Sequence, residues 1–565
     1  GRASLRIVTD MVEEGILTPS EALLKFGDPE RLNEVMQPIF DPAAEQAAER
    51  EGRLVTRGIA ASVGAATGEV VFSSREAAEA GRAGRRIILV RPETSPDDIE
   101  GMEAAQGILT SRGGRTSHAA VVARGMGKAA VVGADAVVIG ESAQAMKVGD
   151  HEIRGGDVIS IDGSTGTVYR GALPLIASPV KRVLEGHPAG AEDEEVYRRF
   201  TCLLEWARGA KALEVLANAD TAQDLALAIR LGAEGVGLLR TEHAVLAEEA
   251  QRVALAALLM ALTSNDRGEI ERVLEVLFPF MRENVRDMFR EFERANPGAP
   301  ARITVRFFDP VVNEFLPATD EERAKIAAVL SITPGEVRER ADRMREVNPM
   351  LGHRGVRLVV ASPALAAMQA RAVFEGAADV VGEGGVPIPE LEIPLVIGTE
   401  EVERVVSVVR QVAHRVMRER GAQFEYRVGV MVETPAGVRT ANAYAPHIEF
   451  ISFGMNDLTQ TVLAMSRDDA GRFLRLYTEE GILKADPFKT IDMRVVGSFV
   501  KEATVRARST NPDIWVGAAG DLGGDPLSVE FFHDAGLNGV SASPWLIPVA
   551  LLAAAQANLK RPRVG

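Results

Sequence analysis

The chain has 565 residues, of which 46% are hydrophobic and 25% are charged, a balance typical of soluble α/β enzymes with two to four domains. A formal net charge of −16 argues against a nucleic-acid or anionic-membrane partner, because both require a basic surface. The single cysteine excludes an internal disulfide framework and cysteine-based metal sites, and without a signal peptide or long apolar run we expect a cytoplasmic location.

Residues 1–50 predict short helices separated by turn signals. The segment LRIVTDMVEEGIL is followed by Thr18-Pro19-Ser20-Glu21, which is a typical helix start. These helices bury little apolar surface by themselves, so we expect them to pack on the part of the chain that follows.

Residues 51–175 predict a compact β/α domain. Short apolar runs such as RIILVRP, AAVVG and VISIDGSTGTVYRG are bounded by glycine and turn residues, as strands commonly are. Asp162-Gly163 predicts a hairpin. The segment RGGRTSHAAVVARGMG lies inside this domain and places His118 at the start of an alanine-rich helix.

Residues 176–196 are rich in proline, glycine and glutamate and predict a linker. From residue 197 to residue 565, strand-like runs alternate with amphipathic helices, which predicts a (β/α)₈ TIM-type barrel and an α/β fold overall. The eight predicted strands are 213–220, 235–242, 303–309, 393–398, 427–433, 450–457, 514–521 and 538–543.

Unusual polar residues stand where these strands end. The carboxyl ends of barrel strands meet at one mouth, so we expect these side chains to lie together. Carboxylates beside arginines describe a site for a small anion with a hard divalent cation such as Mg²⁺. Any single acid can instead cap a helix or form a structural ion pair, an alternative weakened by their recurrence at successive strands. The residues are Arg240, Arg306, Glu433, Asn456, Asp457 and Asp521.

His118 follows Gly113-Gly114 and begins a helix whose first turn Thr116 or Ser117 can cap. The positive helix terminus favours an anion, so a phosphoryl group on this imidazole would be stabilised. Neutral imidazole is a competent nucleophile near pH 7. Two alternatives stay open: a histidine that only caps or packs, and anion binding without covalent chemistry. A histidine outside the barrel reaches its mouth only if its domain moves, which suggests a swivelling carrier domain.

Several long motifs occur in order along the chain, among them GGRTSHAAVVARGMGKAAVVG, GAEGVGLLRTEH, NPMLGHRG, FGMNDLTQT and GGDPLSVEFFHDAGLNGVSASP. By these motifs the sequence resembles the pyruvate, phosphate dikinase branch of the phosphoenolpyruvate-utilising enzyme family over essentially its whole length. The resemblance implies a phosphotransferase in which His118, in a loop with Gly114, Thr116 and Ser117, carries the phosphoryl group on a swivelling phosphohistidine domain.

The resemblance also implies roles at the barrel mouth. Glu433 and Asp457 would hold Mg²⁺, Arg240 and Arg306 would neutralise the transferring phosphoryl group, and Asn456 would contact the substrate carboxylate. The catalytic set implied is His118, Arg240, Arg306, Asn456 and Asp521. The substrate-binding set implied is Arg240, Arg306, Arg354, Glu433, Gly454, Met455, Asn456 and Asp457.

The sequence departs from the dikinases in two ways. Dikinases carry a large N-terminal nucleotide-binding domain, and residues 1–50 resemble only the end of that region. Because the chain has no Gly-rich phosphate loop, we expect a nucleotide-binding domain or a phosphoryl acceptor in trans. The resemblance further implies a homodimer through the barrel, although the stretch SPWLIP lacks the arginine common there.

The second departure lies at the seventh strand, where the family motif G-x-C-G-E reads GAAGD, with Ala519 in the cysteine position. In the family this cysteine protonates the enolate and deprotonates pyruvate. Loss of a general acid lowers a rate about 10²- to 10⁴-fold. We therefore expect transfer from phosphoenolpyruvate to survive and synthesis from pyruvate to be impaired, unless Asp521 or a water substitutes. The alternatives are a catalytically silent phosphoenolpyruvate-binding regulatory or partner subunit, and a family member with an altered substrate.

Overall fold

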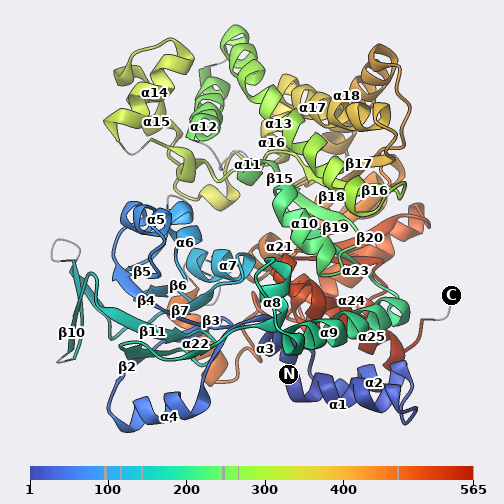
Figure 1. Cartoon of the computed structure of the whole chain (residues 1–565). Helices are drawn as coiled ribbons and strands as arrows, with labels where there is room; N and C mark the ends of the chain where they lie inside the picture. Colours follow the sequence, from blue (N-terminus) through green and yellow to red (C-terminus); the bar gives the residue numbers. More distant parts are fainter. Residues whose placement is uncertain are drawn as a thin grey trace.

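An eight-stranded sheet on one side and a closed barrel on the other make up most of the molecule, with the N-terminal helices packed beneath the barrel in the view of Figure 1. The computed structural model describes residues 1–94, 98–114, 117–140, 144–149, 151–244, 249–264, 266–317, 319–467 and 470–563. The mixed α/β fold predicted from the sequence is confirmed.

The N-terminal helices dock on the barrel, as predicted. Thr18 and Glu21 form a reciprocal capping box at the start of α2 (Pro19–Phe26), which fixes where that helix begins. Leu5 of α1 (Arg2–Glu13) and Phe26 belong to the same apolar core as the barrel helices. The Gln556 side chain of α25 (Ile547–Lys560) donates to the carbonyls of Leu23 and Gly27 at 2.9 and 2.8 Å, so it satisfies the end of α2. The two shorter helices that follow are η1 (Pro29–Leu32) and α3 (Asn33–Met36).

The sheet domain, residues 54–170, is built on eight strands in the order β2-β12-β11-β4-β5-β6-β7-β3. The predicted hairpin is present, with Asp162 of β11 paired to Thr167 of β12. Apolar clusters fill both faces of the sheet, and α5 (Ser74–Arg82), α6 (Ile99–Ala104) and α7 (His118–Gly125) cover one of them. The strands are β2 (Leu54–Arg57), β3 (Ile59–Ser62), β4 (Ala65–Val71), β5 (Ile87–Arg91), β6 (Gly107–Thr110), β7 (Ala129–Val132), β11 (Val158–Asp162) and β12 (Thr167–Arg170), with a side ribbon of β8 (Val138–Gly140), β9 (Ala145–Val148) and β10 (His151–Arg154).

Two passes of the chain connect the sheet domain to the rest of the molecule. β1 (Ile39–Phe40) leads in and β13 (Leu175–Ile176) leads out, and the two pair antiparallel. The predicted linker, residues 176–196, is largely helical, since α8 (Pro179–Leu184) and the start of α9 (Ala191–Ala210) lie within it. Pro179 stands at the first position of α8, where proline favours a helix, so the composition was misleading. Between the entering strand and the sheet lies α4 (Pro42–Arg50).

The barrel is closed by eight parallel strands, β14 to β21, as predicted. One predicted strand is displaced: the fourth is Pro387–Ile393 and not residues 393–398. Two prolines in this strand weaken its prediction from the sequence, because proline is rare in central strands. The strands are β14 (Glu214–Asn218), β15 (Val236–Arg240), β16 (Ala301–Arg306), β17 (Pro387–Ile393), β18 (Arg427–Val432), β19 (Phe450–Gly454), β20 (Trp515–Ala519) and β21 (Gly539–Ala542).

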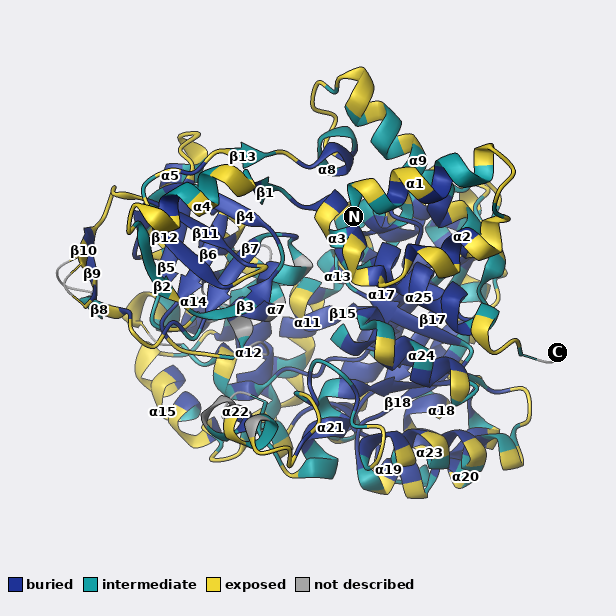
Figure 2. Ribbon diagram, turned by 90° about the horizontal axis from the view of Figure 1, so that it is seen from below, coloured by how far each residue is buried: buried dark blue, intermediate teal, exposed yellow. Residues whose placement is uncertain are grey.

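Helices surround the barrel, and several of them extend the connections from β15 to β16 and from β16 to β17. Figure 2 shows buried strands inside these helices, whose outer faces are exposed. Among the described residues, no helix is both long and apolar enough to cross a membrane. The helices are α10 (Ala222–Arg230), α11 (Thr241–Ala244), α12 (Glu249–Ser264), α13 (Arg267–Ala295), η4 (Val312–Phe315), α14 (Asp320–Leu330), α15 (Pro334–Met344), η5 (Pro349–Leu351), α16 (Val356–Ala361), α17 (Pro363–Gly382), α18 (Thr399–Arg420), α19 (Pro435–Arg439), α20 (Ala441–Tyr444), η6 (Ala445–His447), α21 (Met455–Leu463), α22 (Gly471–Glu479), α23 (Val496–Thr510), η7 (Asp521–Gly524), α24 (Pro526–Asp534) and η8 (Pro544–Leu546).

We predict that Gln556→Ala loosens α2 from the barrel. The substitution leaves the buried Leu23 carbonyl and the partly buried Gly27 carbonyl without this donor, which costs about 1–3 kcal/mol and corresponds to roughly 5- to 150-fold faster exchange of the α2 amides. Hydrogen exchange read by mass spectrometry measures this. Gln411→Ala is the matched control, because the exposed Gln411 amide donates only to Ser407 on its own helix. Equal exchange in both variants would contradict the prediction.

Candidate active site at the barrel mouth

The predicted polar residues meet at the carboxyl end of the barrel. Arg240 and Arg306 are the last residues of β15 and β16, and Glu433 directly follows β18. Asn456 and Asp457 lie in the first turn of α21 and not at the end of the sixth strand, because β19 already stops at Gly454. Asp521, which the sequence predicts at the end of the seventh strand, is the first residue of η7, just beyond the end of β20.

A buried arginine, Arg354, links two carboxylates of the mouth. Its guanidinium binds Asp309 in the bidentate way, with Nε 2.7 Å from Oδ1, and its Nη1 lies 3.1 Å from Oδ1 of Asp457. The side chain is 4% exposed, so these bonds form in a desolvated setting. The hydrogen bonds to Asp309 and Asp457 therefore hold the Arg354 guanidinium in one orientation.

Arg306 is equally buried and shares a carboxylate with Arg354. It donates to Glu242, and its Nη1 lies 3.4 Å from Oδ2 of Asp309. Its Nε is buried and has no hydrogen-bond partner among the described residues. The sequence reasoning missed Asp309 and Glu242, although each stands within three residues of a predicted arginine, in VRFFDP and LLRTEH.

Glu433 has one oxygen in a hydrogen bond and a second that lies 4.0 Å from Arg306 Nη1. Its Oε2 accepts from the backbone N–H of Leu395 at 2.8 Å, whereas its buried Oε1 has no hydrogen-bond partner within the described part of the chain. Burial, then the nearby carboxylates of Asp457 and Asp309, raise the pKa of Glu433 well above its usual value. Gly454 is required here, because a Cβ on it would lie 2.3 Å from that Oε1.

This donor set fits Mg²⁺. A divalent cation would use the free Glu433 oxygen and offset the repulsion between Glu433 and Asp457. No cluster of three or more His, Cys, Asp or Glu side chains with metal-binding geometry occurs among the described residues. Mg²⁺ suits such a site, because it commonly takes one or two carboxylates and fills its other positions with substrate oxygens and water.

Arg240 is the most open of the three arginines. Its backbone N–H and its Nη2 donate to the two oxygens of Asp220 at 2.9 and 3.2 Å, and His243 Nδ1 lies 3.5 Å from the same carboxylate. One third of the Arg240 side chain is exposed, against 8% for Arg306. Arg240 can therefore meet an incoming anion without losing its anchor on Asp220.

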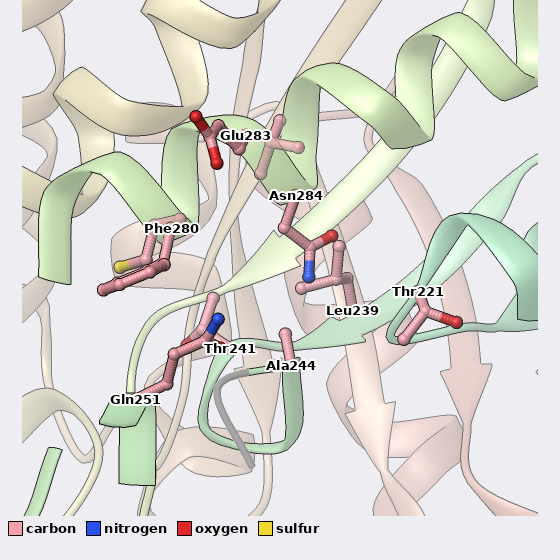
Figure 3. A pocket seen from close by; sticks show the side chains of 10 residues that line it. Thr221, Leu239, Thr241, Ala244, Gln251, Phe280, Glu283 and Asn284 are labelled. Atoms are coloured by element: carbon pink, nitrogen blue, oxygen red, sulfur yellow. The ribbon is translucent and has the colours of Figure 1, made fainter. Parts of the chain in front are cut away.

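A cavity of about 210 Å³ lies beside Arg240, behind β15. Figure 3 shows Leu239 and Thr241 on one side of it and Phe280 and Asn284 of α13 on the other. The Asn284 amide donates to the Asp220 carbonyl at 3.1 Å, which ties this wall to the anchor of Arg240. None of the predicted site residues lines the cavity, so the open mouth, and not this cavity, is the candidate active site.

His118 is the first residue of α7, as the sequence predicts. Ser117 occupies the N-cap position, but the expected side-chain cap is absent: its hydroxyl is buried and has no hydrogen-bond partner among the residues described. The Ser117 N–H instead donates to the Gly114 carbonyl at 3.1 Å. Gly113 adopts φ +99°, which suits glycine, and a Cβ there would crowd Ser117. Thr116 lies outside the described residues.

The α7 helix lies between the sheet domain and the barrel in both views (Figures 1 and 2). Arg124 Nη2 of α7 is 4.0 Å from Oδ2 of Asp521, and both side chains are largely shielded from solvent. The structure thus brings the predicted histidine helix to the same end of the barrel as the predicted arginines and carboxylates.

The wall around Ala519 is apolar. Ala519 ends β20, is 2% exposed and packs with Leu238 and Met431 in a small cluster.

Met455, predicted to contact substrate, is fully buried in the barrel core. The buried Glu392 of β17, which the sequence reasoning also missed, accepts from the Ser452 hydroxyl, and burial raises the pKa of Glu392 to about 7.

Comparisons with known proteins agree with this architecture. Residues 194–559 match the family described as PEP-utilising enzyme, PEP-binding domain, and residues 84–166 match PEP-utilising enzyme, mobile domain. The chain belongs to the PEP-utilising enzyme family. The barrel of this PEP-utilising enzyme thus lies within the match to the PEP-binding domain, and the match to the mobile domain lies within the sheet domain.

Three curated relatives are similar over nearly the whole chain, and all are named pyruvate, phosphate dikinase. Identity is 43% over 558 residues with the protein of Clostridium symbiosum, 41% over 559 residues with that of Rhizobium meliloti, and 42% over 559 residues with a chloroplastic protein of Arabidopsis thaliana. These alignments cover 98–99% of this chain but only 60%, 59% and 55% of the respective relatives. This PEP-utilising enzyme chain therefore spans a little over half of their length.

We predict that Gly454→Ala weakens divalent-cation binding about 10- to 100-fold, the range for disturbed support of a metal ligand. The added methyl group would displace the Glu433 carboxylate, while the backbone of Gly454, at φ −76°, tolerates alanine. Titration with Mn²⁺, followed by electron paramagnetic resonance, measures the affinity. Gly382→Ala is the control, because a Cβ there has no neighbour within 4 Å. Unchanged Mn²⁺ affinity in Gly454→Ala would refute this assignment.

Proposed function

We propose that this chain is a pyruvate, phosphate dikinase-like phosphotransferase that moves a phosphoryl group between phosphoenolpyruvate and His118. The observation that carries the proposal is the contact of Arg124 with Asp521, through which α7 meets the barrel mouth that holds Arg240, Arg306 and Arg354 and their partner carboxylates. The family description, PEP-binding domain, and the name of the relatives, pyruvate, phosphate dikinase, support phosphoenolpyruvate and pyruvate as the substrates.

In the proposed reaction, a nitrogen of the His118 imidazole attacks the phosphorus of phosphoenolpyruvate. The N–P bond forms, the P–O bond to the enol oxygen breaks, and the enolate of pyruvate leaves with the electron pair. Arg240, Arg306 and Arg354 neutralise charge on the phosphoryl oxygens, which is the main catalytic requirement of phosphoryl transfer. Mg²⁺, when bound by Glu433 and Asp457, supplies Lewis-acid stabilisation of the same oxygens.

Asn456 completes the proposed substrate site by contacting the carboxylate of phosphoenolpyruvate. It lies in the first turn of α21, next to Asp457, and it is partly exposed at the mouth. A side-chain amide there can donate to the carboxylate without adding charge. Gly454 leaves the space that this arrangement needs between β19 and Glu433.

The proposal extends to partners and to cellular location. It includes a nucleotide-binding domain or another phosphoryl acceptor in trans, a homodimer through the barrel, and a cytoplasmic location. The finding that supports the first of these is that the matching relatives are much longer than this chain.

We expect one acid-labile phosphate per chain after incubation with phosphoenolpyruvate and Mg²⁺, seen by intact-mass measurement. His118→Asn removes the nucleophile, so labelling should fall to background. His151→Asn, at an exposed histidine of the same domain, is the control and should label fully. Undiminished labelling of His118→Asn would disprove the proposal. Binding of phosphoenolpyruvate by the wild type without labelling would favour a silent regulatory subunit.

The second expectation concerns pyruvate. Because Ala519 lies in an apolar wall and Asp521 is engaged with Arg124, we expect wild-type protein with Mg²⁺ in D₂O to leave the pyruvate methyl group undeuterated above background. Ala519→Cys restores a thiol at that wall and should raise deuteration about 10²-fold or more, the usual contribution of a positioned acid–base group. Proton NMR of pyruvate reads the exchange, with Ala519→Ser as the control of similar size. Rapid deuteration by the wild type would show that another group acts as the base.

A further inference from the structure

At the C-terminal end of α7, opposite to His118, the chain packs against the indole of Trp545. After the helix, Gly127 turns with φ +60°, and a Cβ on Gly127 would lie 2.4 Å from Nε1 of Trp545. Trp545 is 6% exposed and lies in η8, which follows the eighth barrel strand. The backbone of the sheet domain therefore packs directly on the barrel at this point, and only glycine permits so close an approach.

A lysine joins the two partners of that contact. Lys181 Nζ donates to the Gly127 carbonyl at 3.3 Å and lies 5.5 Å from the centroid of the Trp545 ring, within the range of a cation–π interaction. Lys181 belongs to α8, whose Val180 is part of the barrel core and whose Ser178 cap donates to the Val35 carbonyl. Lys181 is therefore fixed to the barrel side, and it reaches across to the sheet domain.

A charge pair completes the contact nearer the mouth. Arg124, in the last turn of α7, faces Asp521 of η7 at 4.0 Å, with 18% and 13% of the two side chains exposed. Gly524 of the same η7 packs against Leu546 of η8, since a Cβ on Gly524 would lie 2.6 Å from the Leu546 Cβ. The two short helices are thus in mutual contact, and each contributes one residue to the contact with the sheet domain, Asp521 from η7 and Trp545 from η8.

We propose that Asp521, Trp545 and Lys181 form a docking seat for the C-terminal end of α7, and that they are positioning residues for the transfer reaction. The inference rests on the proposed function, because the seat holds the helix that begins with His118. An α-helix is rigid over eight residues, about 12 Å, so a grip on one end fixes the position of the other. Asp521 then acts through Arg124 as an orienting group and does not serve as a proton donor.

The position of the seat also gives it a specific kinetic role. The contacts of these residues with the sheet domain are at Arg124 and Gly127, and among the described residues no contact with Arg240, Arg306 or Arg354 is observed, so phosphoenolpyruvate is expected to bind whether or not α7 is seated. Loss of the seat should therefore lower the rate of transfer and leave the affinity for phosphoenolpyruvate unchanged. Because misplacement of a reacting group by about 1 Å can lower a rate 10²-fold, we expect a 10- to 100-fold effect.

Gly127→Ala tests the seat from the sheet-domain side. Gly149→Ala is the matched control, because Gly149 has φ +55°, close to that of Gly127, and a Cβ there has no neighbour within 4 Å. Both variants carry the same backbone strain, but only Gly127→Ala pushes against Trp545. We expect single-turnover labelling of His118 to slow about 10- to 100-fold in Gly127→Ala alone, with equal affinity for phosphoenolpyruvate in both variants.

Fluorine NMR of protein labelled with 5-fluorotryptophan reports seating without any reaction. The chain has three tryptophans, and Trp545→Phe assigns the Trp545 resonance. Gly127→Ala should move that resonance toward its solvent-exposed position, and Gly149→Ala should not. In a Trp545→Ala background, Gly127→Ala should slow transfer no more than Gly149→Ala does, because the clash has been removed.

These outcomes separate the seat from the proposed function. If the wild type is not labelled by phosphoenolpyruvate, the proposed function fails, whereas the fluorine shift still tests the seat. If Gly127→Ala and Gly149→Ala give the same transfer rate and the same Trp545 resonance, the seat is overturned. A change in phosphoenolpyruvate affinity equal to the change in rate would also overturn it, since Trp545 would then act on the substrate site.

Discussion

The barrel mouth depends on one buried chain of opposite charges, in which Asp309 is shared by Arg306 and Arg354, and Arg354 in turn holds Asp457. Isolated charges at this depth would be strongly unfavourable, so each arginine requires its carboxylate. The network fixes the guanidinium groups before any ligand arrives, and it leaves Glu433 with an unsatisfied oxygen. The arginines are thus preorganised, and Glu433 Oε1, which lies 4.0 Å from Arg306 Nη1 and makes no hydrogen bond among the described residues, is the oxygen that the proposed cation would use.

Much of the fold could be predicted because the local sequence patterns agree with the tertiary structure. Strand–helix alternation after residue 197 gave the barrel, and the hairpin at Asp162-Gly163 followed from turn chemistry. The displaced fourth strand shows where such patterns fail: Pro387 and Pro389 suppress the strand signal, yet burial in the closed barrel overrides local propensity. The composition of residues 176–196 predicts only a linker, and it does not show that Pro179 begins the helix α8.

The site residues also fall into two groups, those that the sequence predicts and those that it does not. Residues at strand ends could be found from position alone, because the topology of a parallel barrel brings all those ends together. Asp309 and Glu242 were missed because their task is to hold arginines, and nothing in a sequence distinguishes a buried partner from a solvated acid. The contacts of Trp545 and Lys181 with Gly127 join segments more than fifty residues apart in different domains, and no periodicity encodes them.

The paired strands β1 and β13 restrict how the sheet domain can travel. The polypeptide enters and leaves the sheet domain through one antiparallel ribbon. Rotation of the two strands relative to each other would break the pairing of Ile39 with Ile176 and of Phe40 with Leu175. Bending across the ribbon leaves those pairings intact. Phe40 and Leu175 of the ribbon pack with Ala65 and Tyr169 of the sheet domain, so the ribbon belongs to that domain, and any bend between the two domains would fall on the barrel side of the ribbon.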